Sequence, residues 1–277
     1  MSRITEAFNN GKAFIAFITA GDPSKEKTVE YALAIEKAGA DILEIGIPFS
    51  DPIAEGPVIQ DANVRALANG INTDDVFDMV KEIRKKSKIP LVFLTYINPV
   101  FYYGYERFFK KCHSVGVNGI IVPDLPYDEK SEILEFTKKY DVDIISLIAP
   151  TSKERIRMIA KDATGFVYLV SSMGVTGVRG EIKTDLKKLV KEIKNGTDIP
   201  VAVGFGISTP EQSKKILKIA DGVIVGSAIV KIIEEHGYDS TRYLEEYISE
   251  MKNATKNWIL KNCKIKIKFY YGHALYF

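Results

Sequence analysis

The chain has 277 residues, 46% of them hydrophobic, a composition suited to one large domain or two small ones. Its 38 basic and 36 acidic residues leave a formal net charge of +2, so charge gives no reason to expect nucleic acid or an anionic membrane as a partner. Cys112 and Cys263 lie far apart, and residues 1–12 lack the apolar core of a secretory signal. We therefore expect a cytoplasmic protein without disulfides or membrane-spanning segments.

Eight short apolar runs, rich in Val, Ile and Phe, alternate with helical patterns along the chain. The runs are residues 13–19, 41–47, 90–96, 119–124, 143–149, 165–171, 200–206 and 222–228. Both faces of each run are apolar, which is typical of parallel strands that are buried on both sides. Helices are expected at residues 24–38, 74–87, 105–115, 128–140, 152–161, 184–194 and 209–219. Eight such units predict an α/β fold, a (β/α)8 TIM barrel, and a doubly wound sheet is the alternative.

The repeating units run on without a linker, so we expect a single barrel domain over residues 1–257. Ser24 and Thr73 are expected to cap helices, and residues 2–9 are expected to form a short helix that closes the bottom of the barrel. Residues 258–277 form an unusual C-terminal extension, in which KIKIKF alternates like an amphipathic strand. This extension has no functional interpretation.

The segment 42–57, ILEIGIPFSDPIAEGP, places two carboxylates near one strand end. Glu44 interrupts an apolar run, where a carboxylate is costly unless something pairs or uses it. Glu55 follows 11 positions later in a loop stiffened by proline and glycine. The spacing fits an acid/base pair presented to a substrate. It fits equally an arrangement in which Glu44 forms a buried ion pair with a basic residue and Glu55 is solvated.

Glycines stand at the ends of the last two predicted strands. Gly204 and Gly206 close the run 200–206, and Gly226 and Ser227 close the run 222–228 and open a helix. Free backbone N–H groups at such a helix start can bind an anion, and phosphate sites after the seventh and eighth strands recur in this architecture. We expect a phosphate site without a basic side chain, and the alternative is a pair of tight turns.

Three further features concern a possible lid, metal binding and the walls of a pocket. The glycine-rich segment 171–180 could be a mobile lid or a plain surface loop. The three histidines show no metal-ligand spacing, so no metal site is expected. Apolar side chains near the strand ends could line a pocket or fill the core, and they are Phe17, Leu94, Ile121, Leu147 and Phe205.

The segment LEIGIPFSDPIAEGP resembles the signature of the tryptophan synthase α subunit family. Other segments resemble that family in the same order, namely FITAGDP, LTYINPVF, PDLP, YLVSSMGVTG, GFGIS and VGSAIVKIIE. Together they cover residues 1 to about 250. One position departs from the family pattern, because the family normally carries Asp where this chain has Glu55.

The resemblance implies retro-aldol cleavage of indole-3-glycerol phosphate to indole and glyceraldehyde 3-phosphate. It assigns Glu44 as the catalytic acid/base and places Glu55 at the second catalytic carboxylate, which stabilises the indole N–H. It implies that the apolar set above binds indole together with Tyr168, and that Thr176 hydrogen-bonds the residue at position 55. It adds Gly177 to the phosphate contacts.

The resemblance also implies a β subunit as partner, in an α2β2 complex. This chain would need no cofactor, because pyridoxal phosphate belongs to the β subunit. The docking elements would be loops at the mouth of the barrel, with Pro48, Asp51, Pro52, Pro57, Asn98 and Pro99.

Two other functions compete with this one. The chain could be a catalytically impaired α subunit that acts mainly as an allosteric activator of the β subunit, because of Glu55. It could also be another phosphate-binding barrel enzyme, a ribulose-phosphate epimerase or an indole-glycerol-phosphate synthase. The former would call for metal-spaced His and Asp, and the latter for a lysine at a strand end, which no strand end here supplies.

Overall fold

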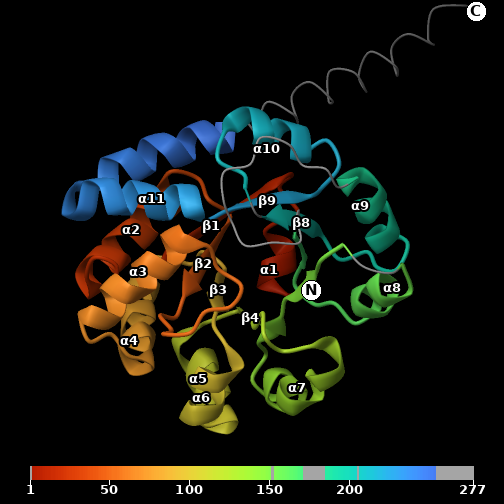
Figure 1. Cartoon of the computed structure of the whole chain (residues 1–277), viewed down its shortest axis with the longest axis horizontal. Helices are drawn as coiled ribbons and strands as arrows, with labels where there is room; N and C mark the ends of the chain where they lie inside the picture. Colours follow the sequence, from red (N-terminus) through yellow and green to blue (C-terminus); the bar gives the residue numbers. More distant parts are fainter. Residues whose placement is uncertain (1, 151–152, 171–184, 205, 254–277) are drawn as a thin grey trace, which may run out of the picture.

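A computed structural model describes residues 2–150, 153–170, 185–204 and 206–253 of the chain. Its parallel strands form one sheet at the centre, and the helices surround it (Figure 1). The strands are β1 (Ala13–Thr19), β2 (Ile42–Gly46), β3 (Leu91–Leu94), β4 (Gly119–Ile121), β5 (Asp143–Ile144), β6 (Ser146–Ile148), β7 (Val167–Val170), β8 (Val201–Gly204) and β9 (Gly222–Val225). The eight predicted runs therefore all contain strands, and the fifth run is divided in two.

The division of the fifth run closes the sheet into a barrel. The strand order is β5-β4-β3-β2-β1-β9-β8-β7-β6, so β5 and β6 stand at the two ends of the sheet. Only Ile145 separates them in the chain, while β5 pairs with β4 and β6 pairs with β7. The two ends of the sheet thus meet in one segment. This confirms the (β/α)8 barrel and rules out the doubly wound sheet, which has open edges.

Helices follow the strands as the alternating pattern predicts. They are α1 (Arg3–Glu6), α2 (Lys25–Lys37), α3 (Pro57–Ala68), α4 (Thr73–Arg84), α5 (Ile97–Tyr103), α6 (Tyr105–Val115), α7 (Ser131–Lys139), α8 (Lys153–Lys161), α9 (Leu186–Lys194), α10 (Pro210–Ile216) and α11 (Ser227–His236), with short 3-10 turns η1 (Tyr127–Glu129) and η2 (Gly237–Asp239). Residues 241–253 are helical as well. The expected domain boundary at residues 257 and 258, and the extension beyond it, lie outside the described residues.

Helix capping agrees with the sequence at one predicted position and differs at another. Ser24 caps α2 as expected, and its side chain accepts a hydrogen bond from the backbone N–H of Lys27. The cap of α4 is Asn72, not Thr73, because Asn72 and Asp75 form a reciprocal capping box. Asparagine outcompetes the following threonine because Asp75 stands at the matching third helical position.

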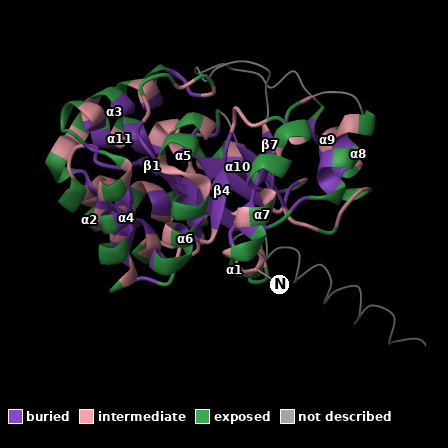
Figure 2. Ribbon diagram, turned by 90° about the horizontal axis from the view of Figure 1, so that it is seen from below, coloured by how far each residue is buried: buried purple, intermediate pink, exposed green. Residues whose placement is uncertain are grey.

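The barrel interior is apolar at its lower end. Every second strand residue points inward, and the inward set includes Ile15, Ile42 and Val92. Ile4 on α1 is fully buried against this set, and the Thr5 hydroxyl donates a hydrogen bond of 3.0 Å to the Gly165 carbonyl. Helix α1 therefore closes the bottom of the barrel as predicted, and buried residues are concentrated in the central strands (Figure 2).

Candidate active site

A cavity of about 250 Å³ opens at the carboxyl ends of the strands. It contains both carboxylates of the segment 42–57, an apolar wall and the start of α11. Its described lining residues are Phe17, Glu44, Ala54, Glu55, Val58, Ile59, Leu94, Pro123, Leu147, Tyr168, Gly206, Ile207, Ser208, Gln212, Ile224, Gly226, Ser227, Ala228 and Lys231. The predicted carboxylates, aromatic residues and helix start thus come together in one place.

Glu44 is a buried carboxyl that has no oppositely charged partner among the described residues. It points inward from β2, where only 2% of its surface is exposed, and its Oε2 atom has no hydrogen-bond partner among the described residues. Burial, and secondly the nearby charge of Glu55, raise the pKa of Glu44 to about 8. The residue is therefore protonated at neutral pH and can donate a proton inside the cavity. Within the part of the chain that the structure describes, Glu44 makes no ion pair, so the alternative of a buried ion pair has no support there.

Glu55 is also buried, and neighbouring side chains hold it in place. It is 6% exposed, and its Oε2 atom accepts a hydrogen bond of 2.7 Å from the Asn63 side chain on α3. Burial raises the pKa of Glu55, while hydrogen bonds from Asn63 and Tyr96 act in the opposite direction. The expectation of a solvated Glu55 is thus wrong, because the loop after β2 folds back over the cavity and α3 covers it.

Helix α3 is a site element that the sequence analysis did not predict. It supplies Val58 and Ile59 to the cavity lining and Asn63 to Glu55. Pro57 stands at its first position and the backbone of Gly56 precedes it as N-cap. Proline just inside a helix start is the signal that would have revealed this helix.

The apolar wall of the cavity matches the sequence at four positions and differs at one. Phe17, Leu94, Leu147 and Tyr168 all line the cavity. Ile121 is fully buried at the end of β4 and is not among the lining residues, whereas Pro123, two positions later, lines the cavity. A flat apolar ligand would lie against this wall.

Gly204 makes room for one residue of the apolar wall. A Cβ atom on Gly204 would lie 2.4 Å from the Tyr168 hydroxyl oxygen, so the missing side chain makes room for the Tyr168 ring. Gly204 does not itself line the cavity. Its expected phosphate contact stays a prediction, and its observed role is the space that it leaves for the Tyr168 ring.

The far end of the cavity is suited to an anion. Gly206 has a φ of +80°, a backbone conformation that favours glycine, and it lines the cavity with Gly226 and Ser227. Ser227 is the first residue of α11, so free backbone N–H groups and the positive end of the helix dipole lie here. The expectation that this end lacks a basic side chain is wrong, because Lys231 also lines it. Its spacing of four residues from Ser227, one helical turn, is the signal that could have found it.

Other predicted site residues lie outside the described part of the chain. Thr176, Gly177 and Phe205 belong to this group, as does the whole glycine-rich segment 171–180. Within the described residues no group of three or more His, Cys, Asp or Glu side chains could hold a metal ion, and no helix there is long and apolar enough for a bilayer.

The expected docking loop is in part helical. Asp51 and Pro52 lie in the loop after β2, and the side chain of Pro48 is buried there. Pro57 begins α3. Asn98 and Pro99 lie in the first turn of α5. Pro57, Asn98 and Pro99 therefore belong to helix starts and not to loops. Proline is compatible with the first helical turn because it lacks an N–H group that would be unpaired there.

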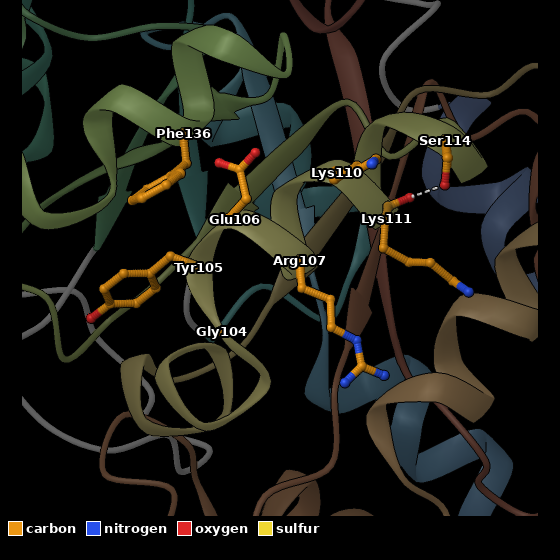
Figure 3. A pocket seen from close by; sticks show the side chains of 8 residues that line it. All are labelled: Gly104, Tyr105, Glu106, Arg107, Lys110, Lys111, Ser114 and Phe136. Carbon is orange, nitrogen blue, oxygen red and sulfur yellow. Dashed lines mark hydrogen bonds between the residues drawn. The ribbon is translucent and has the colours of Figure 1, made fainter.

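A larger hollow of about 750 Å³ lies on the outer surface around α6 (Figure 3). The side chains of Arg107 and Lys111 point away from Tyr105 and Phe136, so they converge on no common point. Two polar groups of this hollow are also engaged elsewhere. Arg107 pairs with Asp74, and the Tyr105 hydroxyl donates a hydrogen bond to Glu132. The chemistry is therefore assigned to the cavity inside the barrel mouth.

The fold and the cavity define a (β/α)8-barrel enzyme in which a protonated carboxyl, an apolar wall and an anion-binding end share one pocket. The sequence profile of the family described as "Tryptophan synthase alpha chain" matches residues 5–258. The chain belongs to this family. The family consists of lyases that cleave indole-3-glycerol phosphate in tryptophan biosynthesis.

Individual relatives support the same assignment over nearly the whole chain. The tryptophan synthase alpha chain of Lacticaseibacillus casei is 51% identical over 92% of this chain and 96% of its own length. That of Thermoanaerobacter sp. strain X514 is 48% identical over 91% and 99%. A crystal structure of the alpha chain from Legionella pneumophila is 38% identical, with a TM-score of 0.83 over 93% of this chain and 98% of that one. A chain from the tryptophan synthase α2β2 complex of Pyrococcus furiosus is 39% identical, with a TM-score of 0.80 over 88% and 99%.

Proposed function

We propose that this chain performs the retro-aldol cleavage of indole-3-glycerol phosphate to indole and glyceraldehyde 3-phosphate. The observation that carries the proposal is the buried, protonated Glu44 in a cavity with an apolar wall at one end and an anion-binding end at the other. The substrate has the matching shape, because a flat apolar indole is joined to a phosphate through a short hydroxylated chain.

The reaction needs one proton donor that later acts as a base. Protonated Glu44 gives its proton to indole C3, which places positive charge on the ring nitrogen. The resulting carboxylate takes the proton of the hydroxyl on the neighbouring side-chain carbon. The O–H electron pair then forms the carbonyl bond, the bond from C3 to that carbon breaks, and its electrons return to the ring. Glu44 ends the cycle protonated, as it began.

Glu55 stabilises the charge that develops on the ring. Its carboxylate would accept the hydrogen bond of the indole N–H, an interaction that strengthens as the nitrogen becomes positive. The position of Glu55 in the cavity lining supports this role. The bonds from Asn63 and Tyr96 favour the ionised carboxylate and so oppose the effect of burial.

The phosphate anchors the substrate at the start of α11. Backbone N–H groups at Gly206, Gly226 and Ser227 would hold it, so binding energy far from the reacting bond orients that bond. This chemistry requires only proton transfers and charge stabilisation, so this chain needs no cofactor of its own. Pyridoxal phosphate is expected on the β partner.

The β subunit docks on the surface beside the cavity mouth, in an α2β2 complex. Three large apolar side chains are exposed there, Ile53 at 70%, Phe101 at 67% and Tyr102 at 92%. The loop after β2 and the start of α5 are joined, because the backbone N–H of Ala54 donates to the Tyr96 hydroxyl at 3.1 Å. Exposed aromatic residues of this kind are enriched at protein interfaces.

The double substitution Phe101→Ser and Tyr102→Ser should weaken binding of the β subunit by about tenfold or more. Indole release by the chain alone should change little, since neither side chain lines the cavity. Titration of the labelled chain with β subunit measures this. The matched control is Tyr238→Ser, which removes an aromatic residue 60% exposed on η2, at the opposite end of α11 from the cavity. Unchanged affinity in the double variant would place the interface elsewhere.

A second function is kept open by Glu55. The family normally has Asp at this position, and the longer side chain is already bound by Asn63 and Tyr96. A misplaced carboxylate would leave an α subunit that mainly activates its β partner. Measurement of indole release from indole-3-glycerol phosphate, with and without excess β subunit, decides between the two. Release that rises with the partner supports the lyase, and binding of the partner with no release supports the activator.

A further inference from the structure

Lys231 is placed where a phosphate would need a cation. It stands on α11 four residues after Ser227, and both residues line the cavity. In an α-helix such a pair lies on one face, and side chains lean toward the helix N-terminus. Lys231 and Ser227 therefore lie one turn apart on the same face of α11, at the same side of the cavity as the free N–H groups of the helix start.

The charges around Lys231 leave its ammonium available for a ligand. Lys231 pairs with Glu235, at 3.7 Å between Nζ and Oε1, and both side chains are more than half exposed. Exposed pairs of this kind contribute little. The neighbouring carboxylate of Glu234 is bound by Arg65 at 3.1 Å. Among the described lining residues, Lys231 is the single cation, and the two carboxylates Glu44 and Glu55 are the acids.

We propose that Lys231 binds the phosphate group of the substrate and thereby selects phosphorylated over unphosphorylated indole compounds. This inference rests on the proposed cleavage reaction. The backbone N–H groups at the start of α11 give hydrogen bonds, and Lys231 adds a full positive charge that they lack. Because Lys231 is half-exposed, its contribution is moderate and depends on salt.

The test compares Lys231→Gln with the unchanged chain, using inorganic phosphate and indole as separate probes. The dissociation constant of inorganic phosphate and the KM for indole-3-glycerol phosphate should both rise about threefold to tenfold, and kcat should change less than twofold. The affinity for indole should stay the same, since its wall lies at the other end of the cavity. Lys231→Arg should keep most of the phosphate affinity.

Two controls separate this role from a general loss of charge. Lys215→Gln removes an exposed lysine of α10 that does not line the cavity, and it should leave phosphate binding unchanged. Glu235→Gln removes the competing partner and should leave the phosphate affinity equal or higher. Raised salt should weaken phosphate binding to the unchanged chain more than to Lys231→Gln.

The outcomes distinguish this inference from the proposed reaction. Normal cleavage with an unchanged KM and unchanged phosphate affinity in Lys231→Gln would overturn the role of Lys231 and leave the reaction standing. Weaker phosphate binding in Lys231→Gln, with no cleavage by the unchanged chain, would support the anion contact and overturn the reaction. Equal losses in Lys231→Gln and Lys215→Gln would overturn the specific contact.

Discussion

Substitution of Glu44 by glutamine should lower kcat for indole release by about 10²–10⁴-fold. The amide has nearly the shape of the protonated carboxyl but can neither give a proton to indole C3 nor take one from the hydroxyl. Because Glu44 lies on the rigid strand β2 and not at the phosphate end, the affinity for inorganic phosphate should stay the same. Steady-state kinetics with excess β subunit, together with phosphate titration, measure both quantities.

The raised pKa of Glu44 predicts a pH dependence of the activity. The cleavage begins with the protonated carboxyl, so kcat/KM of the unchanged chain should fall as the pH rises through about 8. This descending limb should be absent from the residual activity of Glu44→Gln. A kcat/KM that rises through the same range would mean that the reaction starts from the ionised carboxylate.

The same pKa predicts an effect on stability, and its sign follows from the direction of the shift. The folded pKa of about 8 lies above the ordinary carboxyl value of 4.5, so the folded chain holds this proton more tightly than the unfolded chain. The stability that this provides is complete below pH 4.5 and is lost as the pH rises through about 8. Glu44→Gln should therefore gain in unfolding free energy relative to the unchanged chain over this window, by an amount on the order of a few kcal/mol.

Denaturant titrations at several pH values measure this difference. Glu82→Gln is the matched control, because it removes an exposed carboxylate on the outer helix α4 that pairs with Lys85. It should change neither kcat nor the pH dependence of the stability difference. A difference between Glu44→Gln and the unchanged chain that stays constant from pH 4.5 to 9 would show that Glu44 is not shifted.

The strands could be predicted because each one is apolar on both faces. This pattern arises wherever helices cover the outside of a parallel sheet and side chains fill its inside. The break at Ile145 could not be predicted, since the fifth run reads as one continuous apolar segment. The division comes from barrel closure, in which β5 and β6 pair with different neighbours, and that constraint is absent from local sequence.

The site could be predicted where its chemistry is local to one strand end, and not where it depends on packing. Glu44 was recognisable as a carboxyl inside an apolar run. Residues alone gave no sign that Ile121 is left out of the cavity lining or that Gly204 makes room for Tyr168, because both facts depend on side-chain positions across strands. Asn63 was missed because its contact with Glu55 joins a helix to a loop.

Substitution of Glu55 by aspartate should raise kcat/KM by about tenfold. The glutamate has one more methylene and one more rotatable bond, and a displacement of about 1 Å at a catalytic contact can cost as much as 10²-fold. Its Oε2 atom is already bound by Asn63 at 2.7 Å, so the longer side chain is directed toward α3. A shorter side chain should draw the carboxylate back from Asn63 and toward the indole nitrogen.

Glu55→Gln is the comparison that isolates the charge. It keeps the length of the side chain but cannot offset a positive ring nitrogen, so its kcat should fall by about 10²-fold or more. Asn63→Ala should raise the pKa of Glu55 further, because the bond from Asn63 favours the ionised form.

If the unchanged chain is as fast as Glu55→Asp or faster, the displacement argument is wrong and the backbone of the loop has adjusted to the longer side chain. If Glu55→Asp gains activity while β-subunit binding is unchanged, the departure at position 55 limits catalysis alone. Binding of the β subunit would then be the function that this chain retains in full.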